Sequence, residues 1–337
     1  MSLDEFIQIY QPAIEGALSE TVALSNGAGL EELHRMMAYH LGWIGEGAGP
    51  SATGKRIRPL LVLLTTQASG GDWHKALPAA AAVELIHNFS LIHDDIEDNS
   101  TLRRGRPSIW VKWGIPLAIN TGDTMFTLAH LAVLDIEKTN NHHITLEAVK
   151  ILQTTCLHLT QGQHLDISYE DEQVLPVEAY WPMIQGKTAA LISACTEIGA
   201  LIADVDKSTR KTYRRFGRDL GLAFQALDDI LGIWGDSVKI GKSNASDLVA
   251  GKKSLPVLYG LAQNGEFAKR WLSGPITPDE VPELANHLDL EGARDYTQNE
   301  ANRLTESATN ALERAQPQGT AGQALKQLTD QLLQRKV

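Results

Sequence analysis

Three carboxylates in the stretch HNFSLIHDDIED are spaced so that they could hold a metal ion. If this stretch is helical, Asp94 and Asp98 lie one turn apart, and Asp95 reaches the same side of the helix. Like charges on one face repel one another unless a cation neutralises them, and oxygen ligands suit a hard ion such as Mg²⁺. The motif taken alone is equally compatible with a magnesium site and with a solvated acidic helix end.

Basic residues follow these acids directly, at positions 103, 104 and 106. A second acidic pair, Asp228 and Asp229, ends the stretch FQALDD, and a lysine-rich segment follows it. Carboxylates that hold a metal, next to cations that hold an anion, suit a metal-complexed phosphate or diphosphate. Because the arrangement occurs twice, we interpret it as a site for such a ligand.

The elements that position these acids are predicted to be helices. Apolar residues recur at intervals of three and four, whereas alternating, β-branched strand patterns are scarce. The periodic segments are residues 3–24, 30–41, 60–68, 76–98, 146–168 and 213–232. Two or three amphipathic helices are expected after residue 282. The chain is therefore predicted to be all-α.

A glycine-rich segment, residues 42–59, separates the second and third predicted helices. It ends in the cations Lys55, Arg56 and Arg58. Backbone N–H groups and cations there could cradle a diphosphate, although the glycines could equally supply only a turn. This segment is a second candidate anion site.

Length and composition narrow the class of protein. The 337 residues, 43% of them hydrophobic, can build a substantial core, and because no linker is visible we predict one domain, residues 1–337. The net charge of −11 argues against broad binding to nucleic acids or anionic membranes. Neither a signal peptide nor a membrane span is recognisable, so a soluble cytoplasmic protein is expected. Cys156 and Cys195 lack metal-ligand spacing and are expected to be buried thiols.

Between Gly54 and Pro256 the chain resembles the trans-isoprenyl diphosphate synthases, or polyprenyl synthetases. The motifs that carry the resemblance are, in order, GKRIRP, HNFSLIHDDIED, LRRGRP, GQHLD, GKT, FQALDD, GK, SD and GKKSLP. The resemblance implies an all-α, isoprenoid synthase-type helical bundle around a central cavity, commonly in a homodimer. It implies that isopentenyl diphosphate is joined to an allylic diphosphate (dimethylallyl, geranyl or farnesyl), with about three Mg²⁺ ions per active site.

The resemblance also assigns roles to residues at matching positions. The metal ligands would be Asp94, Asp98 and Asp228, supported by Asp95 and Asp229. The allylic diphosphate would contact Arg103, Lys187, Lys242 and Lys252. Isopentenyl diphosphate would contact Lys55, Arg58, His87 and Arg104. The expected catalytic residues are Lys187, Thr188 and Gln225, of which Thr188 and Gln225 would lie near the reacting carbons.

Some of these positions could also have a purely structural role. His87 lies two turns before Asp94 on the same face, but a lone histidine there could equally be a hydrogen-bonded core residue.

Two departures from the family pattern stand out. Gly232 occupies the place of a third aspartate, which implies weaker metal affinity rather than lost activity, and Thr53 replaces the first of two glycines.

The length of the product is predicted from the residues before the first motif. Phe89 and Ser90 are the fifth and fourth residues before Asp94, and no insertion separates the acids, as in the geranylgeranyl diphosphate synthases. On an ideal helical wheel Ser90 lies about 40° from Asp94, and Phe89 lies about 140° away. The wheel supports a small Ser90 that leaves room for the growing chain. The assignment of Phe89 as the cavity floor, and of geranylgeranyl diphosphate (C20) as the product, rests on the resemblance.

Other functions remain open at this point. The product could be farnesyl diphosphate or a longer polyprenyl diphosphate. A terpene cyclase would normally carry an Asn/Ser/Glu motif where this chain has FQALDD. A non-catalytic regulatory relative is suggested by Gly232, and a helical metal-dependent phosphohydrolase by the pair His93 and Asp94.

Overall fold

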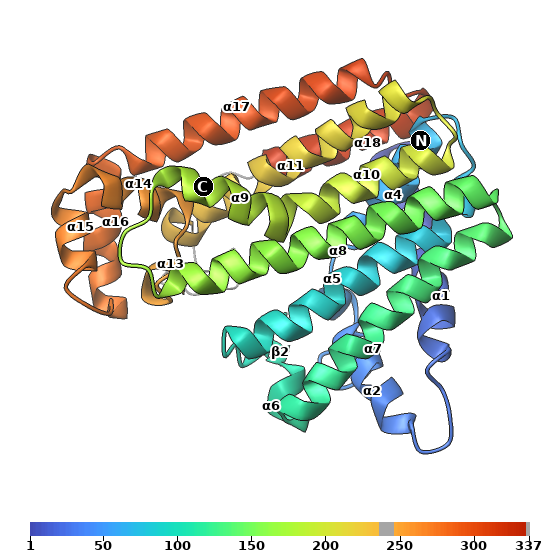
Figure 1. The fold of residues 1–337 in the computed structure, drawn as a ribbon, viewed down its shortest axis with the longest axis horizontal. Helices are drawn as coiled ribbons and strands as arrows, with labels where there is room; N and C mark the ends of the chain where they lie inside the picture. Colours follow the sequence, from blue (N-terminus) through green and yellow to red (C-terminus); the bar gives the residue numbers. More distant parts are fainter. Residues whose placement is uncertain (236–245, 335–337) are drawn as a thin grey trace. The chain divides into compact units, whose positions relative to one another are not determined.

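The computed structural model describes residues 1–235 and 246–334 and is 78% helical. The strands within these ranges are β1 (Leu102–Arg103) and β2 (Arg106–Pro107), which form one antiparallel hairpin. The all-α prediction is confirmed (Figure 1).

The helices follow one another along the chain with short connections. The α-helices are α1 (Leu3–Ala23), α2 (Glu31–His40), α3 (Pro50–Thr53), α4 (Ile57–Ala68), α5 (Leu77–Glu97), α6 (Ile109–Trp113), α7 (Ile115–Leu134), α8 (His142–Glu170), α9 (Tyr180–Ile184), α10 (Ala190–Ile202), α11 (Lys207–Trp234), α13 (Ser246–Val249), α14 (Leu255–Gln263), α15 (Glu266–Trp271), α16 (Val281–Leu290), α17 (Ala293–Arg314) and α18 (Gly319–Leu333). The 3₁₀ turns are η1 (Trp73–Ala76), η2 (Asp135–Lys138), η3 (Val177–Ala179) and η5 (Pro278–Glu280), and η4 (Gln185–Ala189) is a π-helical turn.

Contacts within the chain define two compact units. The first unit comprises residues 1–154, 194–210 and 316–325. The second comprises residues 155–193, 211–315 and 326–337. Helices α8, α10 and α11 each contribute residues to both units. The expectation of a single domain stays a prediction.

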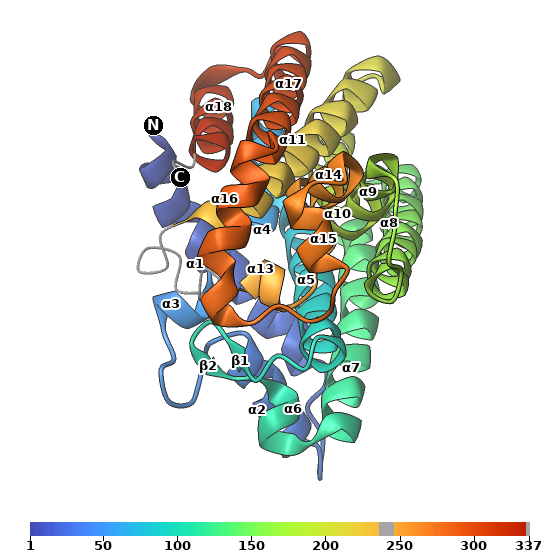
Figure 2. The same cartoon turned by 90° about the vertical axis from the view of Figure 1, so that its left-hand side faces the viewer.

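In the first unit α5 packs along α7 (Figures 1 and 2). Small residues permit the close approach, since the alanines at 79–82 of α5 are buried. A Cβ atom at Gly122 of α7 would overlap the imidazole of His93 on α5. Close packing of these helices fixes the end of α5, where the first acidic motif lies.

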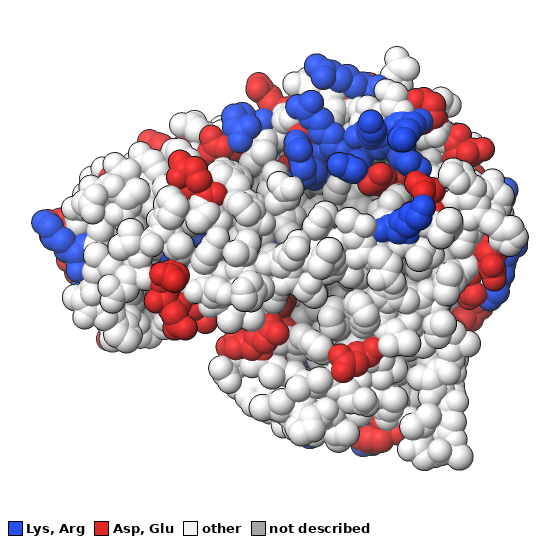
Figure 3. Space-filling model, in the orientation of Figure 1, with Lys and Arg blue, Asp and Glu red and all other residues white. Residues whose placement is uncertain are grey.

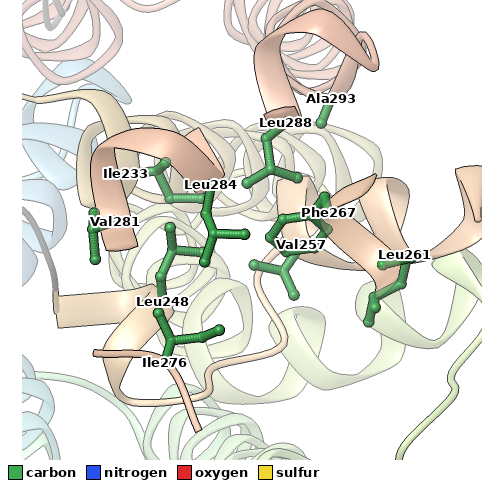
Figure 4. Packing of buried hydrophobic residues seen from close by; sticks show 11 residues of the cluster. Ile233, Leu248, Val257, Leu261, Phe267, Ile276, Val281, Leu284, Leu288 and Ala293 are labelled. Carbon is green, nitrogen blue, oxygen red and sulfur yellow. The ribbon is translucent and has the colours of Figure 1, made fainter. Parts of the chain in front are cut away.

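In the second unit α8 packs against the π-helical turn η4. Gly162 of α8 and Gly186 of η4 touch through their backbones, and a Cβ atom on Gly162 would be 2.6 Å from the carbonyl carbon of Gly186. Further along the chain, buried apolar side chains of α11, α13, α14, α15 and α16 form one cluster (Figure 4). This cluster holds the short helix α13 against the end of α11 through Leu248 and Ile233.

The basic side chains are unevenly distributed over the surface. On the face shown in Figure 3, Lys and Arg gather where the first half of α11 runs. The exposed cations of that half are Lys207, Lys211, Arg214, Arg215 and Arg218. Helix α11 is therefore basic in its first half, and the acids of FQALDD lie in its last third. Among the residues that the structure describes, none of the helices is long and apolar enough to span a membrane.

Candidate active site

The first acidic motif lies at the carboxyl end of α5. Asp94 is half-buried, Asp95 is buried, and Asp98, the capping residue of the helix, is exposed. The negative end of the helix dipole and the neighbouring carboxylates both favour the binding of a cation at this position. A bound cation therefore stabilises more charge here than it would on an ordinary acidic surface.

Asp95 is paired with Arg103. Its Oδ1 accepts hydrogen bonds from Nε of Arg103, at 2.9 Å, and from Nη2. Burial raises the pKa of the Asp95 carboxyl, and the neighbouring Arg103 lowers it. Its Oδ2 is buried and has no hydrogen-bond partner among the described residues. Buried polar atoms are nearly always satisfied, so this oxygen fits a place beside a cation or a water molecule.

Arg104 lies in the tight turn between β1 and β2. Arg104 and Gly105 have φ angles of 53° and 73°, and positive φ at both central residues is typical of a type I′ hairpin turn. The guanidinium donates from Nη1 to the carbonyl oxygens of Ala52, at 2.8 Å, and Thr53, at 3.1 Å. Gly54 has a φ of 76°, which favours glycine, and a Cβ atom there would also be 3.2 Å from Cζ of Arg104. Arg104 therefore holds the end of the glycine-rich segment.

Arg56 also anchors the glycine-rich segment, a role that was not predicted from the sequence. It is 3% exposed and has a left-handed backbone with φ of 47°. Its Nε donates to Glu15 at 2.7 Å, its Nη1 to Glu84 at 2.9 Å, and its Nη2 to the carbonyl of Leu41 at 3.1 Å. The only sequence signal was its place between two other cations.

The structure brings together Arg58, His87 and Arg104, three of the residues predicted to bind isopentenyl diphosphate. Burial, together with the charges of Arg58 and Arg104, holds the pKa of His87 well below its usual value. Burial and nearby arginines also hold the pKa of His40 well below its usual value. Both imidazoles are therefore neutral near pH 7. Lys55 is exposed in the connection between α3 and α4.

His40 is the member of this cluster that sequence reasoning did not find. It is 8% exposed, and its Nε2 is buried without a hydrogen-bond partner in the described parts of the chain. A small pocket beside it is lined by Arg103, Arg104 and Arg106. A neutral imidazole can donate one hydrogen bond to an anion without adding charge.

The second acidic motif lies near the end of α11. Asp229 is buried and accepts hydrogen bonds from the hydroxyl of Tyr180 at 2.8 Å, Nε2 of Gln225 at 2.9 Å and the backbone N–H of Leu255 at 3.0 Å. Burial raises the pKa of the Asp229 carboxyl to about 7, although the three donors lower it. Asp229 thus ties α11 to α9 and α14, and it positions the half-buried Asp228 beside it.

The predicted catalytic residues also lie in the second unit. The hydroxyl of Thr188 donates to Oε1 of Gln225 at 2.9 Å, so these two residues are in contact. Lys187, in the π-helical turn η4, forms an ion pair with Asp166 of α8. Such turns often occur at functional sites. The roles assigned to these three side chains stay predictions.

The predicted cations beyond α11 are described only in part. Lys252 is exposed, between α13 and α14. Lys242 lies outside the described residues.

The acids fit a divalent cation that is shared with a phosphate ligand. No group of three or more His, Cys, Asp or Glu side chains within residues 1–235 and 246–334 forms a metal site by itself. Mg²⁺ in proteins is usually held by one or two carboxylates together with substrate phosphates. The unsatisfied Oδ2 of Asp95 and the crowded acids at the end of α5 are consistent with that kind of site.

The residues predicted to set the product length point in different directions. The hydroxyl of Ser90 donates to the carbonyl of His87 at 2.9 Å and is half-buried. The ring of Phe89 packs against His93, with centroids 4.8 Å apart, and against Phe126 of α7, at 4.9 Å. Phe89 therefore contacts α7.

Comparisons with known proteins connect this arrangement to one family. The polyprenyl synthetase family matches residues 49–286. Over 278 residues the chain is 39% identical to a (2E,6E)-farnesyl diphosphate synthase of Mycobacterium tuberculosis, covering 80% of this chain and 76% of the relative. It is 42% identical over 240 residues to a geranylgeranyl diphosphate synthase of the same organism, covering 71% and 68%.

Solved structures show the same fold. A geranylgeranyl pyrophosphate synthetase from Pyrococcus horikoshii Ot3 superposes with a TM-score of 0.89 at 32% identity, covering 99% of this chain and 98% of that one. A polyprenyl synthase from Caulobacter crescentus CB15, complexed with calcium and isoprenyl diphosphate, has a TM-score of 0.84 at 28% identity, covering 100% and 98%.

The residues singled out in the sequence are thus embedded in a fold shared with prenyl synthases. The family match covers more than half of the chain and includes both acidic motifs, the arginine hairpin and η4. The expected resemblance is confirmed. The chain belongs to the polyprenyl synthetase family and is a metal-dependent trans-prenyltransferase acting on isoprenyl diphosphates.

Proposed function

We propose that this enzyme condenses isopentenyl diphosphate with an allylic diphosphate and that its main product is geranylgeranyl diphosphate. The observation that carries the proposal is the cluster of Arg58, His87 and Arg104 in the same unit as the first acidic motif. A terpene cyclase needs one diphosphate site, whereas a condensing enzyme needs a second one for isopentenyl diphosphate. The cluster supplies cations and a neutral imidazole for that second diphosphate.

The allylic substrate is proposed to bind through Mg²⁺ at Asp94, Asp98 and Asp228. When bound, Mg²⁺ neutralises the charge that develops on the leaving diphosphate. Arg103, Lys187, Lys242 and Lys252 are proposed to add positive charge around the same leaving group. Arg103 is positioned for this role by its pair with Asp95.

The reaction proceeds by ionisation, condensation and elimination. The C–O bond of the allylic diphosphate breaks, the double bond of isopentenyl diphosphate attacks the carbocation, and loss of a proton forms the new alkene. Thr188 and Gln225, which are in contact with each other, are proposed to present oxygen dipoles near the developing positive charge. The helices exclude water, which would otherwise quench the cation. The departing diphosphate is the proposed base, so no side chain needs to act as a nucleophile.

The proposal of a C20 product is supported by Ser90. Ser90 is small and lies on the same side of α5 as Asp94. Relatives include both farnesyl and geranylgeranyl diphosphate synthases, so the length needs a direct test. Purified protein should be incubated with Mg²⁺, isopentenyl diphosphate and each allylic starter in turn, and the dephosphorylated alcohols separated by chromatography. A dominant C20 alcohol supports the proposal, and a dominant C15 or longer alcohol contradicts it.

The enzyme is also proposed to be a homodimer. Large apolar side chains on α7 are exposed, among them Leu117 (45%), Leu131 (45%) and Leu134 (47%). Exposed apolar surface of this kind is more typical of an interface than of a solvated helix. Light scattering on the purified protein should give about twice the mass of 36.8 kDa. The predicted cytoplasmic location stays a prediction.

A further inference from the structure

The first half of α11 presents a row of cations to solvent. Lys211, Arg214, Arg215 and Arg218 are exposed and belong to the second unit, and we call them the basic face of α11. Because they are three and four residues apart, positive charges lie next to one another on the helix, which is unfavourable. Figure 3 shows Lys and Arg gathered over this half of the helix. On a chain whose net charge is −11, such a concentration of positive charge indicates a surface that meets an anion.

The neighbouring acids neutralise the basic face only in part. Arg215 and Arg218 share one acid, Asp219, whose side chain is 2% exposed. Within the part of the chain that the structure describes, no ion pair reaches Lys211 or Arg214. The face therefore keeps an excess of positive charge that a ligand could neutralise.

Two of the four cations are held in place although they are exposed. Oδ1 of Asp219 accepts a hydrogen bond from Nε of Arg218 at 2.8 Å, and its Oδ2 accepts one from Nε of Arg215 at 3.5 Å. The hydroxyl of Ser307 on α17 donates to the same Oδ2 at 2.6 Å and accepts from Nη2 of Arg215 at 3.3 Å. The side chains of Arg215 and Arg218 are nevertheless 56% and 46% exposed. Side chains that are fixed in advance lose less conformational freedom when they bind.

The basic face has no apolar anchor. Tyr213 and Phe216, the aromatic residues between the cations, are buried, and the exposed side chains of residues 211–218 are all charged. Specific protein interfaces are centred on aromatic and apolar side chains that become buried. A layer of anionic lipid headgroups needs no such anchor, because Lys and Arg bind it by charge and guanidinium groups donate to phosphate oxygens. The face therefore fits a phosphate-bearing surface better than a protein partner.

We propose that the basic face of α11 is a reversible docking surface for an anionic lipid bilayer. The choice of a bilayer among phosphate-bearing surfaces rests on the proposed function, since a C20 diphosphate is an amphiphile that partitions from water into membranes. An enzyme docked in this way releases its product beside the lipid phase. The contact is electrostatic and involves no insertion, because residues 211–218 expose no apolar side chain.

Co-sedimentation with phospholipid vesicles measures this docking without turnover. The unmodified protein should bind vesicles of phosphatidylcholine that contain about 30% phosphatidylserine, and it should not bind vesicles of phosphatidylcholine alone. Binding should be lost when the salt concentration rises from about 50 mM to about 500 mM, because salt screens exposed charges.

A double variant tests the basic face itself. Lys211→Gln with Arg214→Gln removes two exposed cations that lie outside the Asp219 cluster, and circular dichroism checks that the fold is retained. Each cation at an anionic bilayer strengthens attachment about fivefold, so binding should weaken about 30-fold. The matched control, Lys138→Gln with Lys269→Gln, removes two exposed cations of η2 and α15. Its binding should stay within about threefold of that of the unmodified protein.

The outcomes identify the partner. Equal binding to both kinds of vesicle overturns the proposal, and so do equal losses of binding in the two double variants. Duplex DNA and polyglutamate serve as alternative anionic probes. Binding of either probe without binding to the vesicles assigns the basic face to another partner and also overturns the proposal.

Activity separates this inference from the proposed function. Lys211→Gln with Arg214→Gln leaves the proposed active site intact, so condensation measured without vesicles should be unchanged. A protein that binds the vesicles as expected but forms no prenyl product refutes the proposed function alone. A protein that forms the product but does not bind the vesicles refutes the docking surface alone.

Discussion

Removing the carboxylate of Glu84 should destabilise the segment that carries the isopentenyl diphosphate site. Glu84 accepts a hydrogen bond from Nη1 of Arg56 at 2.9 Å and another from Nδ2 of Asn88 at 3.0 Å. The side chains of Arg56 and Glu84 are 1% and 3% exposed, so solvent screens their interaction very little. The substitution Glu84→Ala leaves a buried guanidinium with fewer partners.

The size of the expected loss in unfolding free energy depends on the hydrogen bonds that Arg56 and Asn88 keep in the variant. Breaking a buried ion pair by removing one partner costs about 3–5 kcal/mol. Arg56 keeps its bonds to Glu15 and to the carbonyl of Leu41, and Asn88 keeps its bond to the carbonyl of Glu84. We therefore expect a loss near the lower end, about 3 kcal/mol in the free energy of unfolding. Glu84→Gln should cost less, because its amide oxygen still accepts a hydrogen bond.

Urea denaturation followed by circular dichroism measures this loss. The control is Lys138→Ala, in the same unit, which removes a pair with Asp135 whose side chains are 67% and 42% exposed. An exposed pair of this kind contributes at most about 1 kcal/mol. In the folded Glu84→Gln variant, KM for isopentenyl diphosphate should rise more than KM for the allylic substrate. A loss below about 1 kcal/mol for Glu84→Ala would refute the anchoring role of Arg56.

Three further predictions concern product length, pH dependence and the second motif. Ser90→Phe should shorten the main product from C20 towards C15. An unchanged alcohol profile on chromatography would show that Ser90 does not set the product length. Burial holds the pKa of His40 in the folded protein well below its usual value near 6.5, which applies to the unfolded chain. The unfolding free energy that depends on the neutral imidazole is therefore fully present above pH 6.5 and is lost as the pH falls below that value. In urea titrations, His40→Gln should therefore flatten the fall in unfolding free energy by about 1.4 kcal/mol per pH unit below 6.5, and a slope equal to that of the original protein would contradict a buried, neutral His40. Tyr180→Phe removes one donor from the buried Asp229 and should lower the unfolding free energy by about 1–3 kcal/mol, whereas an unchanged urea midpoint would contradict the hydrogen-bond network.

The fold could be predicted from the sequence wherever one face of a helix is polar. Residues 3–24 and 146–168 show clear periodicity and correspond to α1 and α8. Helix α7 has no counterpart among the predicted segments. It carries apolar residues on its exposed side as well as on its buried side, so its periodicity is blurred. The start of α4 at Ile57 was also missed, because it lies inside the glycine-rich segment.

The site could be predicted as a set of residues, but not as a set of contacts. Spacing placed Asp94, Asp95 and Asp98 at the end of a helix, which the structure bears out. It gave no indication that Asp95 would be buried against Arg103, or that Asp229 would be surrounded by three hydrogen-bond donors. Those contacts depend on β1, α9 and α14, which are brought to the acids by tertiary packing.

The same limit applies to site residues that lie far from the acidic motifs in the sequence. His40 and Arg56 carry no metal or catalytic motif, and they are recognised only from their burial and their neighbours.

The central claim is that each of the two acidic motifs binds divalent cations together with a diphosphate. The most direct measurement is a crystal structure with Mn²⁺ in place of Mg²⁺ and with inorganic diphosphate, in which anomalous scattering locates the metal. We predict a manganese peak within coordination distance of Asp94 and another within coordination distance of Asp228, each with diphosphate oxygens among its ligands. Manganese at one motif only, or a diphosphate bound away from both acids, would contradict the account.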